Sequence, residues 1–76
     1  MKISVKYFAS MRDLMGKTSE SVDLDGDATV VDLWAKLSEA PMPENTLIAV
    51  NMEYTNVEQT LSDGDEVGFF PPVTGG

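Results

Sequence analysis

The 76-residue sequence contains no cysteine and no histidine. Without cysteine no disulfide supports the fold, and no thiol can act as a nucleophile or metal ligand. Without histidine the chain lacks the commonest general base at neutral pH and the commonest zinc ligand. We therefore expect no metal site and no catalysis by this chain alone.

Basic residues are also few. Thirteen aspartates and glutamates stand against five lysines and arginines, which gives a formal net charge of −8 at pH 7. That charge would repel a phosphate backbone, so we expect no nucleic-acid partner. It would attract a basic protein surface, although solubility is the commoner reason for an acidic surface.

Long apolar runs are missing as well. The first residues, Met1-Lys2-Ile3-Ser4, lack the apolar segment of a signal peptide or membrane span. We expect a cytoplasmic protein that has no membrane partner. The length allows one small domain, near the lower limit at which a hydrophobic core alone stabilises a fold without disulfides or a structural metal.

Alternation of apolar and polar residues predicts strands at both ends of the chain. Residues 2–8 alternate from Ile3 to Tyr7, and residues 66–70 alternate in the same way. Between these ends we expect three more strands. They are a polar strand that ends in the turn at 25–27, an apolar strand over residues 46–50, and a short edge strand within residues 51–59.

Two helices are expected between the strands. The main helix follows Thr29, a predicted N-cap, and carries one apolar stripe that includes Trp34. A shorter helix over residues 11–15 would begin at a Ser10 cap and stop at Gly16.

This order of elements predicts an α+β fold of the ubiquitin-like β-grasp type. We expect a mixed sheet of four to five strands with one main helix packed across it. In this arrangement the first and last strands lie side by side and parallel at the centre, and here they are the most apolar strands. We place the domain at residues 1–70 and an extended, projecting C-terminal tail at residues 71–76.

The composition of the tail suits insertion into a partner. Pro71 and Pro72 fix φ, remove two backbone donors and favour an extended Phe70. The tail could reach roughly 20 Å at about 3.3 Å per residue. Gly75 and Gly76 have no side chains, so the terminal carboxylate could enter a narrow channel. A frayed terminus is the alternative, but the prolines and the apolar strand before them favour a function.

Two segments carry a family resemblance. The run LSDGDEVGFFPPVTGG, residues 61–76, resembles the C-terminus of the small subunits of molybdopterin synthase. The run YFASMRDLMG, residues 7–16, resembles the strand-to-helix junction of the same family. The tail motif is highly specific, the N-terminal motif is moderately specific, and the middle of the chain matches mainly by pattern.

The resemblance implies a ubiquitin-like sulfur carrier. Its Gly76 would be adenylated by an activating enzyme that uses ATP, and a sulfurtransferase would then supply the sulfur of a thiocarboxylate. In the large subunit this group would convert cyclic pyranopterin monophosphate into molybdopterin. The family also suggests a heterotetramer, and no cofactor would be bound permanently by the chain.

The resemblance also implies roles for individual residues. Phe8 and Phe70 fall opposite the inward-facing sets of their strands, which favours exposure over core packing. Arg12 is equally well explained as a solvated surface charge. The implied contacts with the large subunit are Phe8, Arg12, Tyr54 and Phe70, and the implied tail-insertion residues are Pro71, Pro72, Val73, Thr74 and Gly75.

Two alternatives remain open from the sequence. The chain could carry sulfur for thiamine, cysteine or tRNA thiolation, or be conjugated to protein lysines. The Phe-Phe-Pro-Pro-Val run before the glycines favours the molybdopterin branch over these. The other alternative is a β-grasp interaction module whose tail is inert.

Overall fold

The computed structural model describes residues 1–72. The predictions that concern Val73, Thr74, Gly75 and Gly76 lie outside the described residues. No helix between Met1 and Pro72 is long and apolar enough to cross a membrane. The elements of this part of the chain are β1 (Lys2–Tyr7), α1 (Ser10–Met15), β2 (Ser19–Asp23), α2 (Val30–Leu37), β3 (Leu47–Val50), β4 (Glu53–Thr55) and β5 (Glu66–Phe70).

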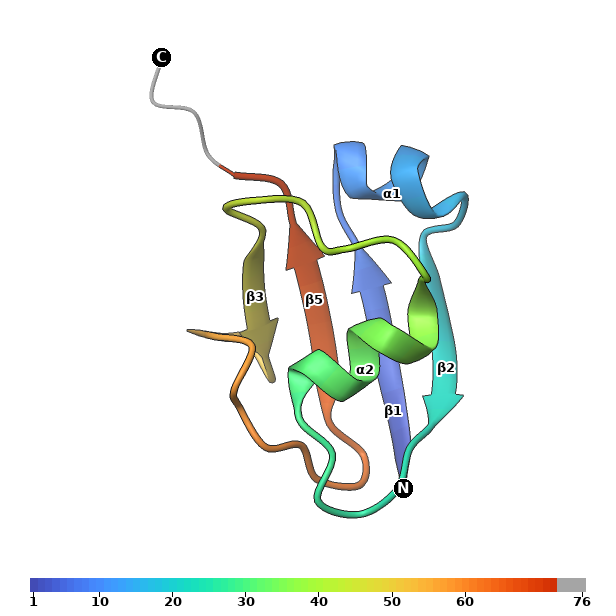
Figure 1. Ribbon diagram of the computed structural model, residues 1–76, viewed down its shortest axis with the longest axis vertical. Coiled ribbons are helices and arrows are strands. Elements are labelled where there is room, and N and C mark those ends of the chain that lie inside the picture. The colour runs from blue at the N-terminus through green and yellow to red at the C-terminus, as the bar shows by residue number, and fades with distance from the viewer. Residues whose placement is uncertain (73–76) are drawn as a thin grey trace.

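The strands form one mixed sheet in the order β2-β1-β5-β3-β4. The central pair, β1 and β5, is parallel, and the other pairs are antiparallel. Helix α2 crosses one face of this sheet (Figure 1). The predicted α+β arrangement of the β-grasp type is therefore confirmed, including the central position of the first and last strands.

The core lies between α2 and the sheet face that it covers. The inward residues of β1 and β5 are almost completely buried, as the alternation predicted. Burial of one large apolar side chain contributes about 1.5–3 kcal/mol, so the two central strands supply much of the hydrophobic stabilisation. The buried cluster consists of Ile3, Val5, Tyr7, Met11, Val30, Leu33, Trp34, Ile48, Leu61, Val67 and Phe69.

The N-cap prediction is confirmed for α2. The backbone N–H of Thr29 donates to the Asp32 carboxylate at 2.8 Å, which is half of a capping box. At the other end of this helix, the Trp34 indole N–H donates to the Ala40 carbonyl at 2.8 Å. Trp34 is thus a core residue whose polar atom is satisfied.

The prediction that Ser10 caps α1 is wrong, although the helix itself and its stop at Gly16 are confirmed. Ala9 is the N-cap, with φ of 50°, and no side chain caps the helix. The reason is the length of the β1 pairing, because the Phe8 N–H still donates to the Phe69 carbonyl at 3.1 Å. Only Ala9 is left to turn the chain, and Ser10 is already the first helical residue.

Candidate functional site

The sheet face opposite α2 carries an aromatic patch, which we define as Phe8, Tyr54 and Phe70 together with Met52. Phe8 is 40% exposed, Tyr54 72% and Met52 92%, whereas Phe70 is half-buried. Alternation along β1 and β5 places Phe8 and Phe70 on this face, because their neighbours Tyr7 and Phe69 point into the core. The patch is therefore a feature of the open face of the sheet.

The three rings of the patch contact one another through Phe70. The Phe8 and Phe70 rings are stacked, with centroids 4.3 Å apart and planes within 2°. On the other side, the Tyr54 ring lies edge-on to Phe70, with centroids 6.1 Å apart and an interplanar angle of 67°. These are the offset-stacked and edge-to-face geometries that aromatic pairs prefer. The structure thus brings together three of the four residues predicted to contact a large subunit.

Small residues of the central strands form the floor beneath the rings. Gly68 of β5 pairs with Ala49 of β3 on one side and with Lys6 of β1 on the other. A Cβ atom at Gly68 would lie 3.1 Å from Phe70 Cε1 and 3.2 Å from Phe8 Cε2, closer than ordinary van der Waals contact. The shallow hollow of this face is lined by Lys6, Phe8, Ala49, Met52, Tyr54, Glu66, Gly68 and Phe70.

The Asn51-Met52 turn between β3 and β4 holds Met52 in the patch. Both turn residues have positive φ, 50° for Asn51 and 71° for Met52, as in a two-residue hairpin turn of type I′. Glycine is the usual residue at the second position, because a side chain there is strained. Sequence reasoning missed Met52 and Gly68, since their role depends on strand register and turn type.

Arg12, the fourth predicted contact residue, lies on α1 and does not line the hollow. Its side chain is exposed, and its Nε lies 3.5 Å from the Ala9 carbonyl. An ion pair borders the hollow, with Lys6 Nζ and Glu66 Oε2 3.3 Å apart. This pair is about half exposed, so it contributes about 1 kcal/mol or less.

Pro71 and Pro72 directly follow Phe70, which is the last residue of β5 and part of the aromatic patch. The chain therefore leaves the sheet beside this patch. Pro71 is half-buried and Pro72 is exposed. The N-terminus lies at the opposite end of the sheet (Figure 1). The structure therefore places the start of the predicted tail next to the predicted contact residues.

Acidic residues are concentrated at the end of the sheet away from the tail, where β1 and β5 begin. Two basic residues lie at each end, Arg12 and Lys17 at the tail end and Lys2 and Lys36 at the acidic end. The tail end has fewer acidic residues, so it is the less negative of the two. A negatively charged partner would be repelled more by the far end than by the tail end. The residues at the acidic end are Asp23, Asp25, Asp27, Asp32, Glu53, Glu58, Asp63, Asp65 and Glu66.

Tyr7, which precedes Phe8 in the chain, is a buried ionisable residue. Its hydroxyl donates to Glu20 Oε2 at 2.6 Å. Burial raises the pKa of Tyr7 well above its ordinary value, and the hydrogen bond and negative charge of Glu20 raise it further. Tyr7 therefore stays protonated at neutral pH and acts as a structural donor rather than a general base.

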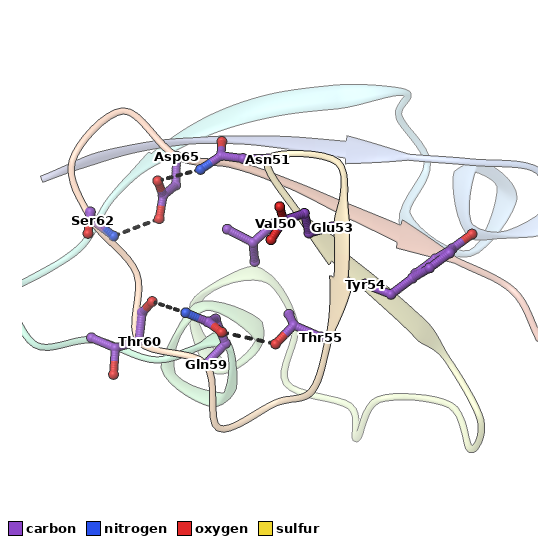
Figure 2. A pocket seen from close by; sticks show the side chains of 9 residues that line it. All are labelled: Val50, Asn51, Glu53, Tyr54, Thr55, Gln59, Thr60, Ser62 and Asp65. Carbon is purple, nitrogen blue, oxygen red and sulfur yellow. Dashed lines mark hydrogen bonds between the residues drawn. The ribbon is translucent and has the colours of Figure 1, made fainter.

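A second hollow, formed by the turns around β4, is polar (Figure 2). Its polar side chains form hydrogen bonds to one another and to backbone groups of the same loops. The Asp65 carboxylate accepts the Asn51 amide at 2.8 Å and the Ser62 backbone N–H at 2.7 Å, and the Thr55 hydroxyl donates to Gln59 at 3.0 Å. Tyr54 points away from these groups (Figure 2). These hydrogen bonds join the loops to one another, so we interpret the residues around this hollow as structural and not as a ligand site.

A mixed sheet with a parallel central pair, one crossing helix and a C-terminal segment beside an aromatic patch defines a ubiquitin-like β-grasp domain. The chain belongs to the ThiS family, whose model matches residues 5–76. The molybdopterin synthase sulfur carrier subunit of Escherichia coli is 39% identical, and the match covers 97% of this chain and 99% of that protein.

Two solved structures support the same assignment. The crystal structure of SAMP1 from Haloferax volcanii superposes with a TM-score of 0.84 at 28% identity, over all of both chains. The complex of subunits 1 and 2 of the molybdopterin-converting factor from Helicobacter pylori contains a chain that matches with a TM-score of 0.71 at 25% identity, again over all of both chains.

Proposed function

We propose that this protein is the sulfur carrier of a molybdopterin synthase and that Gly76 is its working group. The observation that carries the proposal is the 39% identity to the Escherichia coli sulfur carrier subunit along nearly the whole of both chains. The geometry agrees, since the chain leaves β5 directly beside an exposed aromatic patch.

The proposed chemistry needs two activating steps. A carboxylate is a poor acyl electrophile, so the Gly76 carboxylate attacks the α-phosphorus of ATP in an activating enzyme, which forms an acyl adenylate and releases pyrophosphate. Sulfur at the sulfide level, supplied by a sulfurtransferase, then displaces AMP and leaves a thiocarboxylate. In the large subunit the thiocarboxylate sulfur is the nucleophile: it bonds to a carbon of cyclic pyranopterin monophosphate and displaces an oxygen substituent. Water then hydrolyses the resulting thioester, which leaves the sulfur on the pterin and returns Gly76 to a carboxylate.

The aromatic patch is the proposed contact surface for the large subunit. Exposed aromatic side chains are enriched among residues that dominate binding energy. Phe70 and Tyr54 present ring edges and faces beside the start of the tail, so a partner that covers them also receives the tail. The Helicobacter pylori structure, a complex of subunits 1 and 2, supports an assembly of this kind. Arg12 would add a charged contact at the margin.

The intact mass of the protein tests the carrier function. After incubation with the activating enzyme, ATP and a sulfurtransferase with its sulfur source, we expect a gain equal to the replacement of one oxygen by sulfur. The variant that lacks Gly75 and Gly76 is the matched control and should keep its mass and its fold. An unchanged mass for the intact chain, under conditions that modify another carrier, would refute the proposal.

A second candidate is a protein modifier joined to lysine side chains. The likeness to SAMP1, a small archaeal modifier protein, favours it. The same adenylate would then be attacked by a lysine amine, which forms an isopeptide bond and releases AMP. A ladder of higher-mass conjugates that requires Gly76 would favour this candidate, whereas a thiocarboxylate without conjugates favours the sulfur carrier.

A further inference from the structure

We propose that Phe8 is a positioning residue: it fixes the start of the tail by stacking on Phe70, and its effect on the partner interface acts through Phe70. The effect on sulfur transfer rests on the proposed carrier function, but the effect on the isolated protein does not. The proposal assigns the ring at the β1–α1 junction a role in directing a segment at the other end of the chain.

The first observation in support is the close stacking of the Phe8 and Phe70 rings. The two rings lie parallel within 2°, with centroids 4.3 Å apart, so one face of Phe8 is occupied by Phe70. The backbones are joined at the same place, because the Phe8 N–H donates to the Phe69 carbonyl at 3.1 Å. Phe8 is therefore held to the last residues of β5 by both its main chain and its side chain.

The second support is the space beneath the two rings. Gly68 lies between them on the same face, and a Cβ there would approach both rings to 3.1–3.2 Å. The rings can therefore lie flat against the sheet only because residue 68 has no side chain. Tyr54 closes the opposite side of Phe70 with an edge-on contact at 6.1 Å. Phe70 is thus held from below and from two sides.

The third support is the stiffness of the two residues after Phe70. Pro71 and Pro72 have a fixed φ, and a proline restricts the residue before it to extended conformations. The direction that the backbone takes at Phe70 therefore also determines the direction of residues 71–72, because neither proline has a freely rotating φ. Loss of the Phe8 ring would leave Tyr54 as the only aromatic side chain against Phe70 within residues 1–72. The Phe70 ring could then move, which would widen the range of directions in which the chain leaves the sheet.

The isolated protein gives the first test. In a weakly aligned NMR sample, the residual dipolar coupling of the Pro71 Cα–Hα bond reports how firmly this residue follows the domain. We expect Phe8→Ala and Phe8→Leu to reduce this coupling relative to those of the sheet, and Phe8→Tyr to retain it. Val31→Ala, which removes an exposed side chain on α2, is the matched control. An unchanged coupling in folded Phe8→Ala would overturn the proposal.

The second test separates positioning from direct contact. We would measure kcat/KM for sulfur transfer from the thiocarboxylated chain to the large subunit, in a double-mutant cycle of Phe8→Ala and Phe70→Ala. We expect Phe8→Ala to reduce transfer about two- to tenfold in the wild-type background, the range of an aromatic pair, and to have no further effect in Phe70→Ala. Phe8→Tyr should restore transfer, and Phe8→Leu should not.

Equal losses from Phe8→Ala in both backgrounds would show that Phe8 contacts the partner independently, which contradicts the proposal. If the wild-type chain transfers no sulfur at all, the carrier function fails, and the Pro71 coupling alone decides the positioning role. The two failures are therefore distinguishable.

Discussion

Gly68→Val is the substitution that tests the packing of the aromatic patch most directly. Glycine in a strand interior is unfavourable by roughly 0.5–1 kcal/mol relative to alanine, and a β-branched residue is preferred in strands. By intrinsic propensity alone, valine should therefore stabilise β5 by about 1 kcal/mol. The structure predicts the opposite sign, because residue 68 lies beneath the Phe8 and Phe70 rings.

The magnitude depends on the space available. A Cβ at residue 68 already lies 3.1–3.2 Å from both rings, and the two methyl groups of valine extend further. If the rings stay, the site is overpacked at a cost of about 1–3 kcal/mol. If they swing out, the stack is lost at a cost of about 0.5–1.5 kcal/mol, together with the apolar area that the rings covered. After the propensity gain of about 1 kcal/mol is subtracted, we expect a net loss in the free energy of unfolding of about 1 kcal/mol, and at most about 2 kcal/mol.

Urea unfolding followed by the fluorescence of Trp34 measures this loss. Trp34 is the single tryptophan and lies in the core, edge-on to Phe69 at 5.3 Å. In thermal unfolding followed by the same fluorescence, the melting temperature should fall by about 5–15 °C for a domain of this size. Gly26→Val is the matched control, since a Cβ at Gly26 meets nothing within 4 Å. A Gly68→Val midpoint equal to or above wild type, with unchanged chemical shifts for both rings, would refute the packing argument.

Three further predictions concern single residues. Phe69→Ala should lower the free energy of unfolding by about 3–5 kcal/mol, because Phe69 is fully buried between Tyr7 and Trp34. A smaller loss than in a variant at an exposed position, such as Val31→Ala, would contradict the assigned core. Met52→Gly should stabilise the fold by about 0.5–1 kcal/mol, since φ at Met52 is 71°, and should therefore raise the midpoint of urea unfolding. An unchanged midpoint would mean that the backbone of this turn is not strained. The raised pKa of Tyr7 means that the folded state favours the protonated phenol. The resulting contribution to the free energy of unfolding is fully present below pH 10 and is lost as the pH rises above that value. Tyr7→Phe should remove that part of the alkaline loss, and pH titration of unfolding, with Tyr54→Phe as the control for an exposed tyrosine, measures it.

The elements that sequence patterns predicted best are those whose cause is local. Alternation along β1 and β5 identified the buried faces, and the Thr29 cap of α2 was correct because capping depends on residues within one turn. The Ser10 cap failed although its motif was also local. There the pairing of Phe8 with Phe69 set where the strand ended, and this tertiary contact displaced the helix start by one residue.

The aromatic patch shows the limit of sequence patterns. Alternation placed Phe8 and Phe70 on the open face, but it could not show that their rings stack. That contact depends on the parallel register in which Lys6 pairs with Gly68, and on the absence of a side chain at that glycine. Met52 joins the patch through a two-residue turn whose type is not evident from an Asn-Met pair. The roles assigned to the tail, from Pro71 to Gly76, stay predictions.

The parallel pairing of β1 with β5 also bears on how the protein is made. The two strands at the centre of the sheet come from opposite ends of the domain, so a growing chain cannot complete its core until residues 66–70 have left the ribosome. Until then β1 and β3 each present an unpaired edge in the middle of the future sheet, which is a site for aggregation or proteolysis. The high sequence separation of this pair also predicts slow folding for so small a domain. A ribosome-stalled or truncated chain would therefore be recognised as unfolded, and the segment that follows β5 would be presented only by a finished domain.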